Sequence, residues 1–472
     1  MSYNLLDEAW IPVLYRNGLN SRIGILKALS DAGQIRQVSA SNPMDRFAIV
    51  RFLLALLCCI RGKSPAIIDL GYDKALPAGW AENLQSNRGL FNLLGDEHRF
   101  YQCRLDKVKE KLSTNYLAQE VPTGTNSWHF RHSTDGANGL CPACCALGLL
   151  RLPIFATSGG RGKPPGVNSK PPIYAMPVGS SLEETLILLL GEISEAELGT
   201  PAWEKPNLQL PKTGKIPILT GLTWLPRRIW LDDPDPIEAR CISCGSRARL
   251  IRQCIFAGIG STKTDGGDKP RLWSDPHAIY DGEEVMKPSN ALGSSDAAAG
   301  QWARILAGIL KKQQPSTRLW IISFATVQND KYLEAMEYEF ALPFEQDDQE
   351  IQKHIELVEA WQMASSSLAR RLKPKNSPRK HTENLPLIAA IRPHVESKVS
   401  AKASEFLSGE DEAWEHAANE YSQLMTVIAK SLAPGSTTAS VRRRKQIADV
   451  RPYFQSSSKA TRKPVLKPGV SK

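Results

Sequence analysis

Two pairs of cysteines in this sequence have the same Cys-x-x-Cys spacing. The first pair lies in GLCPACCALG, residues 139–148, and the second in RCISCG, residues 240–245. Four thiolates in two such turns match the tetrahedral ligand set of structural zinc, since each turn directs two sulfurs toward one point. We therefore predict a structural zinc site. Its predicted ligands are Cys141, Cys144, Cys241 and Cys244.

The long interval between the two pairs decides what kind of site is expected. A compact zinc finger keeps its ligands close in sequence, whereas pairs this far apart indicate a metal that joins distant segments of a larger fold. A closed shell of four sulfurs leaves no coordination position for water, so the expected role is scaffolding. Four unconnected buried thiols are one alternative. A thioredoxin-like redox couple fits less well because neither pair has a clear strand-to-helix setting.

The other candidate groups do not make a convincing catalytic site, so we predict no catalytic residues. His129 and His132 suit a metal, but no acidic residue beside them completes a hydrolytic site. Asp232 and Asp233 lie in Pro-rich turn sequence and are expected to cap or solvate it. His277, in LWSDPHAIY, is a single histidine of the kind that is more often structural than catalytic.

Two polar, glycine-rich loops are candidates for contact with a partner. Residues 123–139 lead into the first cysteine pair, and their prominent side chains are Trp128, His129, Phe130, Arg131 and His132. Residues 157–170 offer exposed backbone and basic side chains, with a flexible, solvated loop as the alternative. A phosphate loop is unsupported there, because Thr157 and Pro164 stand where Gly and then Ser or Thr are required.

Composition places the chain among ordinary soluble proteins. Its 472 residues are 42% hydrophobic, which suits two or three domains. Nine cysteines without a secretory leader indicate a reducing cytoplasm, where paired thiols bind metal more often than they form disulfides. The most apolar run, residues 47–60, contains Arg51 and is too short to span a bilayer. We expect a buried helix there and no membrane segment.

The net charge of +10 is concentrated at the C-terminal end. Residues 436–472 contain ten basic residues against Asp449 alone, so the rest of the chain is nearly neutral. Contacts with a polyanion must therefore come from local clusters. The strongest cluster consists of Arg442, Arg443, Arg444 and Lys445. For the extreme tail, a solubilising, partly disordered end is an equal alternative.

Hydrophobic periodicity predicts an α+β fold in three parts. Residues 1–344 alternate short apolar stretches with Pro- and Gly-rich connectors, which predicts a large mixed, loop-rich domain that carries the zinc site. Residues 345–455 have long helical periods, which favour a C-terminal four-helix bundle. Residues 456–472 form a basic tail that is expected to be flexible. The clearest periods run through Ile351, Ile355, Val358, Trp361, Ala364, Leu368 and Leu372, and through Trp414, Ala417, Tyr421, Leu424, Ile428 and Leu432.

Several segments, in this order, resemble the large subunit of type I-E CRISPR Cascade, the CasA family. They are NLLDEAWIPVLYRNG (4–18), the two cysteine pairs, GLTWLPRRIWLDDP (221–234), LWSDPHAIY (272–280) and the C-terminal helical part. The resemblance covers most of the chain, and it is weakest in the basic extension after about residue 450.

The resemblance implies a non-catalytic subunit of a prokaryotic, cytoplasmic antiviral complex guided by crRNA. Such a subunit recognises the protospacer-adjacent motif in double-stranded DNA, promotes strand separation and R-loop formation, and provides a docking surface for the helicase-nuclease. The implied partners are the crRNA, the target DNA and the other Cascade subunits, namely the backbone, the crRNA 5′-end cap and the small subunits.

The resemblance also implies roles for individual residues in DNA recognition. The family's glycine loop falls on Ser158, Gly159, Gly160, Arg161 and Gly162, whose backbone can approach minor-groove base edges. Its lysine finger falls on Lys263, with Lys269 as the second choice. Its strand-separating wedge falls on Gln328 and Asn329, with Lys331 beside them.

Two further regions receive roles from the same resemblance. Residues 128–132 match the segment that contacts the crRNA and the backbone subunits; Phe130 keeps the family's aromatic position, while Arg131 and His132 depart from its pattern. The family's bundle lies near the displaced strand, so residues 442–445 are candidates for phosphate contacts.

Two other functions stay open at this level. The first is a zinc-dependent nuclease or hydrolase that acts on nucleic acid, and the second is a purely architectural ribonucleoprotein subunit that never touches DNA. Individual assignments also have structural alternatives. Gln328 and Asn329 would cap the following helix, Lys263 would be a solvated loop charge, and residues 442–445 would neutralise acids of a neighbouring subunit.

Overall fold

The computed structural model describes residues 2–63, 75–105, 111–118, 139–156, 163–169, 171–191, 193, 198–211, 213–259, 271–281, 284–286, 318–327 and 332–341. By its internal contacts the chain divides into two compact units. The first comprises Met1–Ala278 and Ile322–Glu337, and the second Ile279–Ile321 and Tyr338–Lys472. The expected bundle at 345–455 and tail at 456–472 lie outside the described residues, so they and the boundary at 344 stay predictions.

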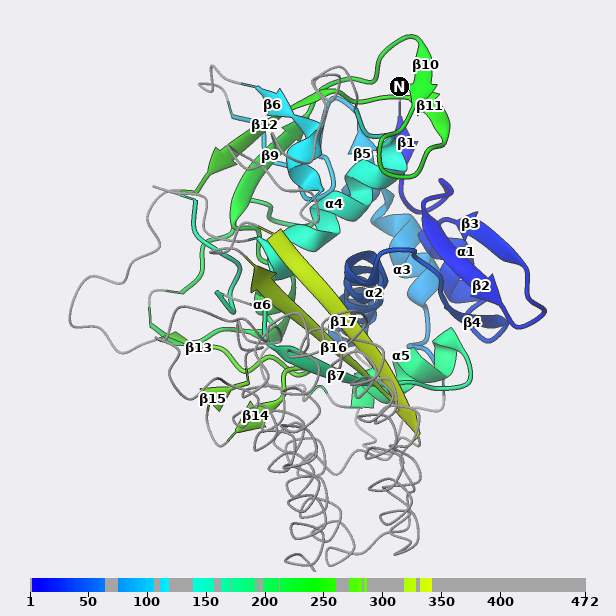
Figure 1. Cartoon of the computed structure of the whole chain (residues 1–472), viewed down its shortest axis with the longest axis vertical. Helices are drawn as coiled ribbons and strands as arrows, with labels where there is room; N and C mark the ends of the chain where they lie inside the picture. The colour runs from blue at the N-terminus through cyan, green and yellow to red at the C-terminus, as the bar shows by residue number, and fades with distance from the viewer. Residues whose placement is uncertain are drawn as a thin grey trace, which may run out of the picture. The chain divides into compact units, whose positions relative to one another are not determined.

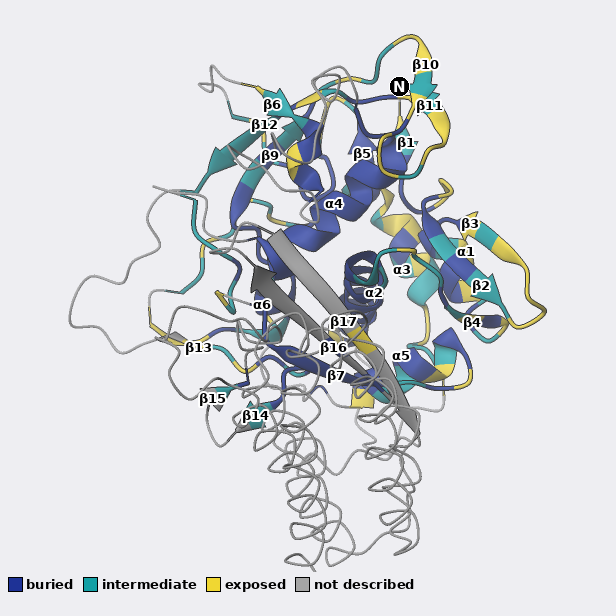
Figure 2. Cartoon of the chain, in the orientation of Figure 1, coloured by how far each residue is buried: buried dark blue, intermediate teal, exposed yellow. Residues whose placement is uncertain are grey.

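Helix α2 (Pro43–Lys63) lies in the core of the first unit (Figure 1). Every residue from 47 to 60 is buried, which confirms the expected buried helix and appears as continuous dark blue in Figure 2. A helix that is apolar all round requires cover on several sides. Four helices contact it: α3 (Trp80–Ser86), α4 (Pro142–Phe155), α5 (Leu182–Gly191) and α6 (Ile218–Thr223).

Aromatic side chains fill the space around α2. The Phe52 ring meets Phe100 and Trp203 edge-on, with centroids 5.5 and 5.7 Å away. The Phe47 ring lies 4.5 Å from Tyr174. Burying one such side chain contributes about 1.5–3 kcal/mol, and edge-on ring pairs add to that. The aromatic positions of this unit are therefore core positions.

Two small sheets and two short helices complete the N-terminal part. Strand β2 (Ile11–Tyr15) pairs antiparallel with β3 (Asn20–Ile23) on one side and β4 (Ile35–Val38) on the other. Helix α1 (Ile25–Ser30) follows β3. Strand β1 (Tyr3–Asn4) pairs with β5 (Asn92–Leu94), which follows the 3-10 helix η1 (Arg88–Phe91).

A three-stranded antiparallel sheet supports the region around the cysteines. Its order is β6 (Leu112–Ser113), β12 (Gln253–Gly258) and β9 (Arg227–Leu231). The 3-10 helix η2 (Thr114–Leu117) follows β6. Between β9 and β12 the chain forms a hairpin of β10 (Glu238–Arg240) and β11 (Arg247–Arg249), seen in green in Figure 1.

The remaining strands are short or belong to one further sheet. Strand β8 (Gly214–Lys215) pairs parallel with β13 (Arg271–Leu272), and β14 (Tyr280–Asp281) pairs with β15 (Glu284–Val285) in the second unit. The last sheet has the order β17 (Tyr332–Ala341), β16 (Arg318–Val327) and β7 (Ile173–Pro177). Helices and small sheets thus alternate along the chain, which confirms the expected mixed α and β character. Within the described ranges, none of the helices has both the length and the apolar composition needed to span a membrane.

Candidate metal centre and buried polar network

The four cysteines expected to bind zinc lie together in the first unit. Their sulfur atoms are all within 4.8 Å of one another, and Cys141 Sγ is 3.8 Å from Cys244 Sγ. Four sulfurs around a zinc ion at about 2.3 Å form a tetrahedron whose edges measure about 3.8 Å. The donor set and its spacing therefore fit a tetrahedral metal with a closed shell. No other group of three or more metal-binding side chains occurs among the described residues.

The first cysteine pair begins helix α4. Leu140 exchanges two backbone hydrogen bonds with Ile251, at 3.1 and 2.8 Å, and Cys141 is then the N-cap of the helix. The segment has no space for a side chain at Gly139, because a Cβ there would lie 2.6 Å from the Ile251 carbonyl oxygen. Cys144 follows in the first helical turn. The described residues directly before this helix contain an isolated bridge and no strand, so the first pair stands at a helix start without the strand-to-helix setting of a thioredoxin-like couple.

The second cysteine pair closes the β10–β11 hairpin. The Cys241 N–H donates to Ser246 O at 2.9 Å, and the Gly245 N–H donates back to Cys241 O at 2.9 Å. Gly245 has a φ of 71°, in the left-handed region that glycine adopts without a steric penalty. This tight turn directs both sulfurs toward one point. The two pairs also touch directly, since the Cys141 N–H donates to Cys241 Sγ at 3.3 Å.

The four sulfurs influence one another's pKa values through hydrogen bonds. The thiols of Cys141 and Cys144 hydrogen-bond to Cys241 and lower its pKa to about 6. The same two partners hold the pKa of Cys244 far below its ordinary value. Hydrogen bonding to Cys141, and then to the other two sulfurs, raises the pKa of Cys144. The four sulfurs therefore titrate as one coupled group, and every thiol that is still protonated must lose its proton when a metal binds.

A cation and an uninvolved thiol adjoin the cluster. Burial alone would lower the pKa of Arg22, but its hydrogen bond to Cys244 and the nearby sulfurs raise that pKa. Its guanidinium therefore stays charged and offsets the negative charge of the thiolates. Cys145, although adjacent to Cys144, is not part of the cluster. Its sulfur faces Leu140 O at 4.0 Å, and complete burial raises its pKa, so it stays protonated.

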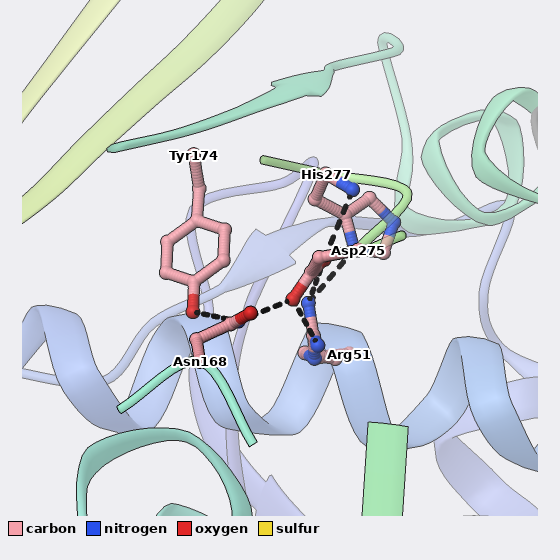
Figure 3. Close-up of polar contacts among 5 residues, drawn as sticks. All are labelled: Arg51, Asn168, Tyr174, Asp275 and His277. Carbon is pink, nitrogen blue, oxygen red and sulfur yellow. Dashed lines mark hydrogen bonds and ion pairs between the residues drawn. The ribbon is translucent and has the colours of Figure 1, made fainter. Parts of the chain in front are cut away.

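A second polar group lies buried on α2 (Figure 3). Arg51 Nη1 and Nη2 donate to the two carboxylate oxygens of Asp275 at 2.8 and 2.6 Å. Asn168 Nδ2 donates to Asp275 Oδ2 at 2.8 Å and approaches the Tyr174 hydroxyl at 3.4 Å. The His277 N–H donates to Asp275 Oδ1 at 3.1 Å, and its ring nitrogen Nδ1 lies 3.2 Å from Arg51 Nη1. Asp275 thus accepts hydrogen bonds from several separate segments.

The protonation of this network indicates a structural role. Burial by itself would raise the pKa of Asp275, but the facing Arg51 guanidinium lowers it to about 2. The carboxylate is therefore charged at neutral pH, as the partner of the Arg51 guanidinium. His277 is fully buried beside it, in agreement with the expectation of a structural histidine.

Only part of this network had a signal in the sequence. A charged residue inside the most apolar run needs a buried partner, so Arg51 indicated that a buried polar group contacts this helix. The identities of Asp275 and Asn168 as its neighbours were missed, since both lie far away along the chain.

The element that follows Gln328 and Asn329 is strand β17, so the alternative that these two residues cap a following helix was wrong. The predicted DNA- and RNA-contacting residues themselves lie outside the described residues. These are Ser158, Gly159, Gly160, Arg161, Gly162, Lys263, Lys269, Gln328, Asn329, Lys331, residues 128–132 and residues 442–445. The two acids of the Pro-rich turn are described. Asp232 pairs with Lys111 at 2.7 Å, and the exposed Asp233 lies 3.7 Å from the buried Arg99, so both acids form ion pairs with residues far away in the sequence, which the expectation of capping or solvation did not include.

Comparison with known proteins places the chain in a family. The model of the family "CRISPR-associated protein Cse1" matches residues 4–450. The curated CRISPR-associated protein CasA/Cse1 of Thermus thermophilus is 29% identical over 257 residues, which is 50% of this chain and 50% of that relative. In sequence, the chain thus matches about half the length of this relative.

Solved structures share the fold along nearly the whole chain. A crystal structure of CasA from Thermus thermophilus aligns with a TM-score of 0.62 at 19% identity, covering 98% of this chain and 100% of that one. A chain of a CRISPR RNA-guided surveillance complex aligns with a TM-score of 0.59 at 16% identity, covering 97% and 99%. Since the family model spans nearly all of the sequence and the fold agrees, the chain belongs to the CRISPR-associated Cse1 family, also called CasA.

Proposed function

We propose that this chain is the non-catalytic large subunit of a crRNA-guided Cascade surveillance complex. In this role it recognises the protospacer-adjacent motif in double-stranded DNA, promotes local strand separation, and provides a docking surface for a helicase-nuclease. The observation that carries the proposal is the family match over residues 4–450. The full-length structural likeness to a chain of an RNA-guided surveillance complex supports it.

The proposed division of labour follows from the energetics of RNA-guided recognition. Base pairing with the guide reads the target, while protein reads a short flanking motif and starts the exchange of strands. That exchange is nearly balanced overall, but opening the first base pairs costs about a few kcal/mol before any pairing with RNA offsets it. Contacts with the motif can supply this free energy. We assign them to residues 158–162 and Lys263 or Lys269, and the opening itself to Gln328 and Asn329 with Lys331 beside them.

We assign the cysteine cluster a structural zinc ion. Zinc would be held by Cys141 and Cys144 at the start of α4 and by Cys241 and Cys244 in the hairpin turn, and it supplies a rigid crosslink. Helix α4 ends at Phe155, just before the glycine loop, and the hairpin leads into β12, which ends just before the segment with the two lysines. The crosslink therefore braces the far ends of two elements that lead toward the proposed DNA contacts.

The remaining partners follow from the same proposal. Residues 128–132 would contact the crRNA and the backbone subunits, and residues 442–445 would contact phosphates of the displaced strand. Motif recognition, assembly next to the crRNA 5′-end cap and the small subunits, and helicase-nuclease docking all require the complete assembly.

Comparing guide-loaded complexes with and without this chain tests the proposal. The substrates are relaxed duplexes that carry the target with either a permissive or a scrambled flanking motif. The complete complex should form R-loops faster on the permissive duplex, and omission of the chain should abolish that preference. Equal rates with and without the chain would contradict the proposal. DNA cleavage by the isolated chain with divalent metal would instead favour a nuclease.

A further inference from the structure

Two segments are assigned to DNA: the glycine loop (158–162) and residues 260–270 with Lys263 and Lys269, called here the lysine segment. The described residues that flank these two segments are held together at two places. We propose that Arg227, Asn168 and Asp275 form a shared stem that positions both segments for recognition of the flanking motif. This inference rests on the proposed function, because the two segments are the ones assigned to DNA. The residues of the stem themselves lie wholly within the first unit.

The first anchor is Arg227 at the start of β9. Arg227 is buried, and its Nη1 donates to Pro164 O, two residues beyond the glycine loop. A second bond, to Pro226 O at 2.8 Å, fixes the guanidinium. In the sheet register, Arg227 pairs with Gly258, which is the last residue of β12 before the lysine segment. One residue therefore holds the C-terminal end of the first segment and the N-terminal end of the second.

The second anchor is the buried carboxylate of Asp275. Asp275 follows β13, the strand that begins directly after the lysine segment, and Asn168 follows the glycine loop. The 2.8 Å bond from Asn168 Nδ2 to Asp275 Oδ2 joins these two ends (Figure 3). Arg51 attaches the pair to the core helix α2 through its two bonds to the same carboxylate.

The described residues that flank the glycine loop are also joined to each other. The Gly166 N–H donates to Ala156 O at 2.9 Å, so the residues on either side of 157–165 meet. A Cβ at Gly166 would lie only 2.7 Å from the Pro153 carbonyl oxygen, so this closure requires glycine. The two ends of the glycine loop thus meet through a backbone bond, and its C-terminal end meets the C-terminal end of the lysine segment through the bond from Asn168 to Asp275. The N-terminal end of the lysine segment is attached through the strand pairing of Gly258 with Arg227.

A common stem has a consequence for binding. Two recognition segments on independent supports would each lose conformational freedom on binding DNA, whereas segments fixed at a shared base lose less. Loosening the stem should therefore weaken motif recognition by both segments at once. The loss should appear in selectivity for the motif, because contacts outside the motif do not depend on the stem.

The test uses two variants in the assembled, guide-loaded complex. Asn168→Ala removes the bond between the two anchored ends and keeps the buried Arg51–Asp275 pair, while Gly166→Ala forces the loop ends apart. Asn168→Asp extends the series, since it places a second carboxylate beside Asp275. The matched controls are Asn207→Ala, on an exposed turn, and Gly89→Ala, where a Cβ would meet nothing within 4 Å.

Two measurements are made on each variant. Hydrogen exchange is followed in peptides that cover 157–170 and 259–272, and the rate of R-loop formation is compared on permissive, scrambled and pre-opened targets. We expect faster exchange in both peptides for Asn168→Ala and Gly166→Ala. We also expect a loss of about fivefold in motif selectivity, the factor that corresponds to one hydrogen bond, with pre-opened targets unaffected. Asn168→Asp should lose more than Asn168→Ala, and the controls should match the wild type.

The two readouts separate the inference from the proposed function. Faster exchange in 157–170 alone would overturn the shared stem, and so would no change in either peptide. Faster exchange in both peptides with unchanged selectivity would overturn the positioning role. A wild-type complex that ignores the flanking motif would refute the proposed function instead, and the exchange data would still decide whether the stem exists.

Discussion

At the scale of single residues, Arg51 and Asp275 form a buried ion pair in the core of the first unit. Their side chains are 4% and 0% exposed, and two short bonds join them. Removing one partner from such a pair leaves an uncompensated buried charge. Exposed pairs such as Lys27 and Asp31 differ, since solvent screens both members.

We expect Arg51→Met to lower the free energy of unfolding by about 3–5 kcal/mol, because Asp275 would be left charged and unpaired. The measurement is urea-induced unfolding at neutral pH, followed by the fluorescence of the buried tryptophans. As the matched control, Lys27→Met at the exposed pair should cost less than about 1 kcal/mol. Adding Asp275→Asn to Arg51→Met should restore part of the loss, since it removes the stranded charge; an additive loss would contradict this account.

The pair also predicts a pH dependence. The pKa of Asp275 is lowered from 3.8 to about 2 in the folded chain, so its contribution is complete above pH 4 and is lost as the pH falls toward 2. The difference in unfolding free energy between the wild type and Asp275→Asn should therefore shrink by about 2 kcal/mol over that interval. Unfolding of both proteins at several pH values measures it. A constant difference would show that the carboxylate is not preferentially ionised in the fold.

At the scale of elements, the cysteine cluster joins a helix start to a hairpin turn that lies far away in the sequence. The beginning of α4 and the β10–β11 turn each present two sulfurs, and neither element is held by a large sheet. The hairpin has three residue pairs, too few for independent stability. Its conformation should therefore depend on the metal more than that of α4, which packs against α2.

We expect Cys144→Ser to abolish stoichiometric zinc binding and to lower the thermal unfolding midpoint, because three thiolates no longer close the shell. Metal content after gel filtration, and the thiolate charge-transfer band after cobalt substitution, measure the first effect. Cys103→Ser is the matched control, since Cys103 is partly exposed and lies outside the cluster. Full zinc content in Cys144→Ser would exclude the four-sulfur site.

At the scale of the whole molecule, the proposed function is the opening of DNA within a larger complex. Strand opening needs more than one element of the chain. The free energy of the motif contacts must be coupled to separation of the first base pairs, and these two tasks are assigned to different segments. The assignment of the wedge to Gln328 and Asn329 is a prediction at this scale.

We expect the double change Gln328→Ala and Asn329→Ala to slow R-loop formation on linear duplex by about tenfold or more, as the opening step costs a few kcal/mol. Binding to a target with a pre-opened bubble should stay at the wild-type level, because that step is bypassed. Stopped-flow fluorescence of a base analogue beside the motif follows the opening. Equal losses on both substrates would assign these amides to general affinity and not to strand separation.

Some features were predictable because they depend on local pattern. The buried helix at 47–60 follows from an unbroken apolar run, and the hairpin cysteines follow from a spacing that suits one tight turn. The position of the first pair at the N-terminus of α4 depends instead on a contact that is distant in sequence, the isolated bridge from Leu140 to Ile251. The expected bundle and the DNA-contacting residues lie outside the described residues and stay predictions.

The sequence by itself determined which residue types are available: two cysteine pairs, a charged residue in an apolar helix, and motifs that resemble one family. The tertiary structure decided which of them meet. It placed the four sulfurs within 4.8 Å, chose Asp275 as the partner of Arg51, and brought Asn168 and Arg227 to the ends of two separate segments. The physical reason is that pairing a buried charge or closing a metal shell depends on distances through space, and those arise only when the whole core packs.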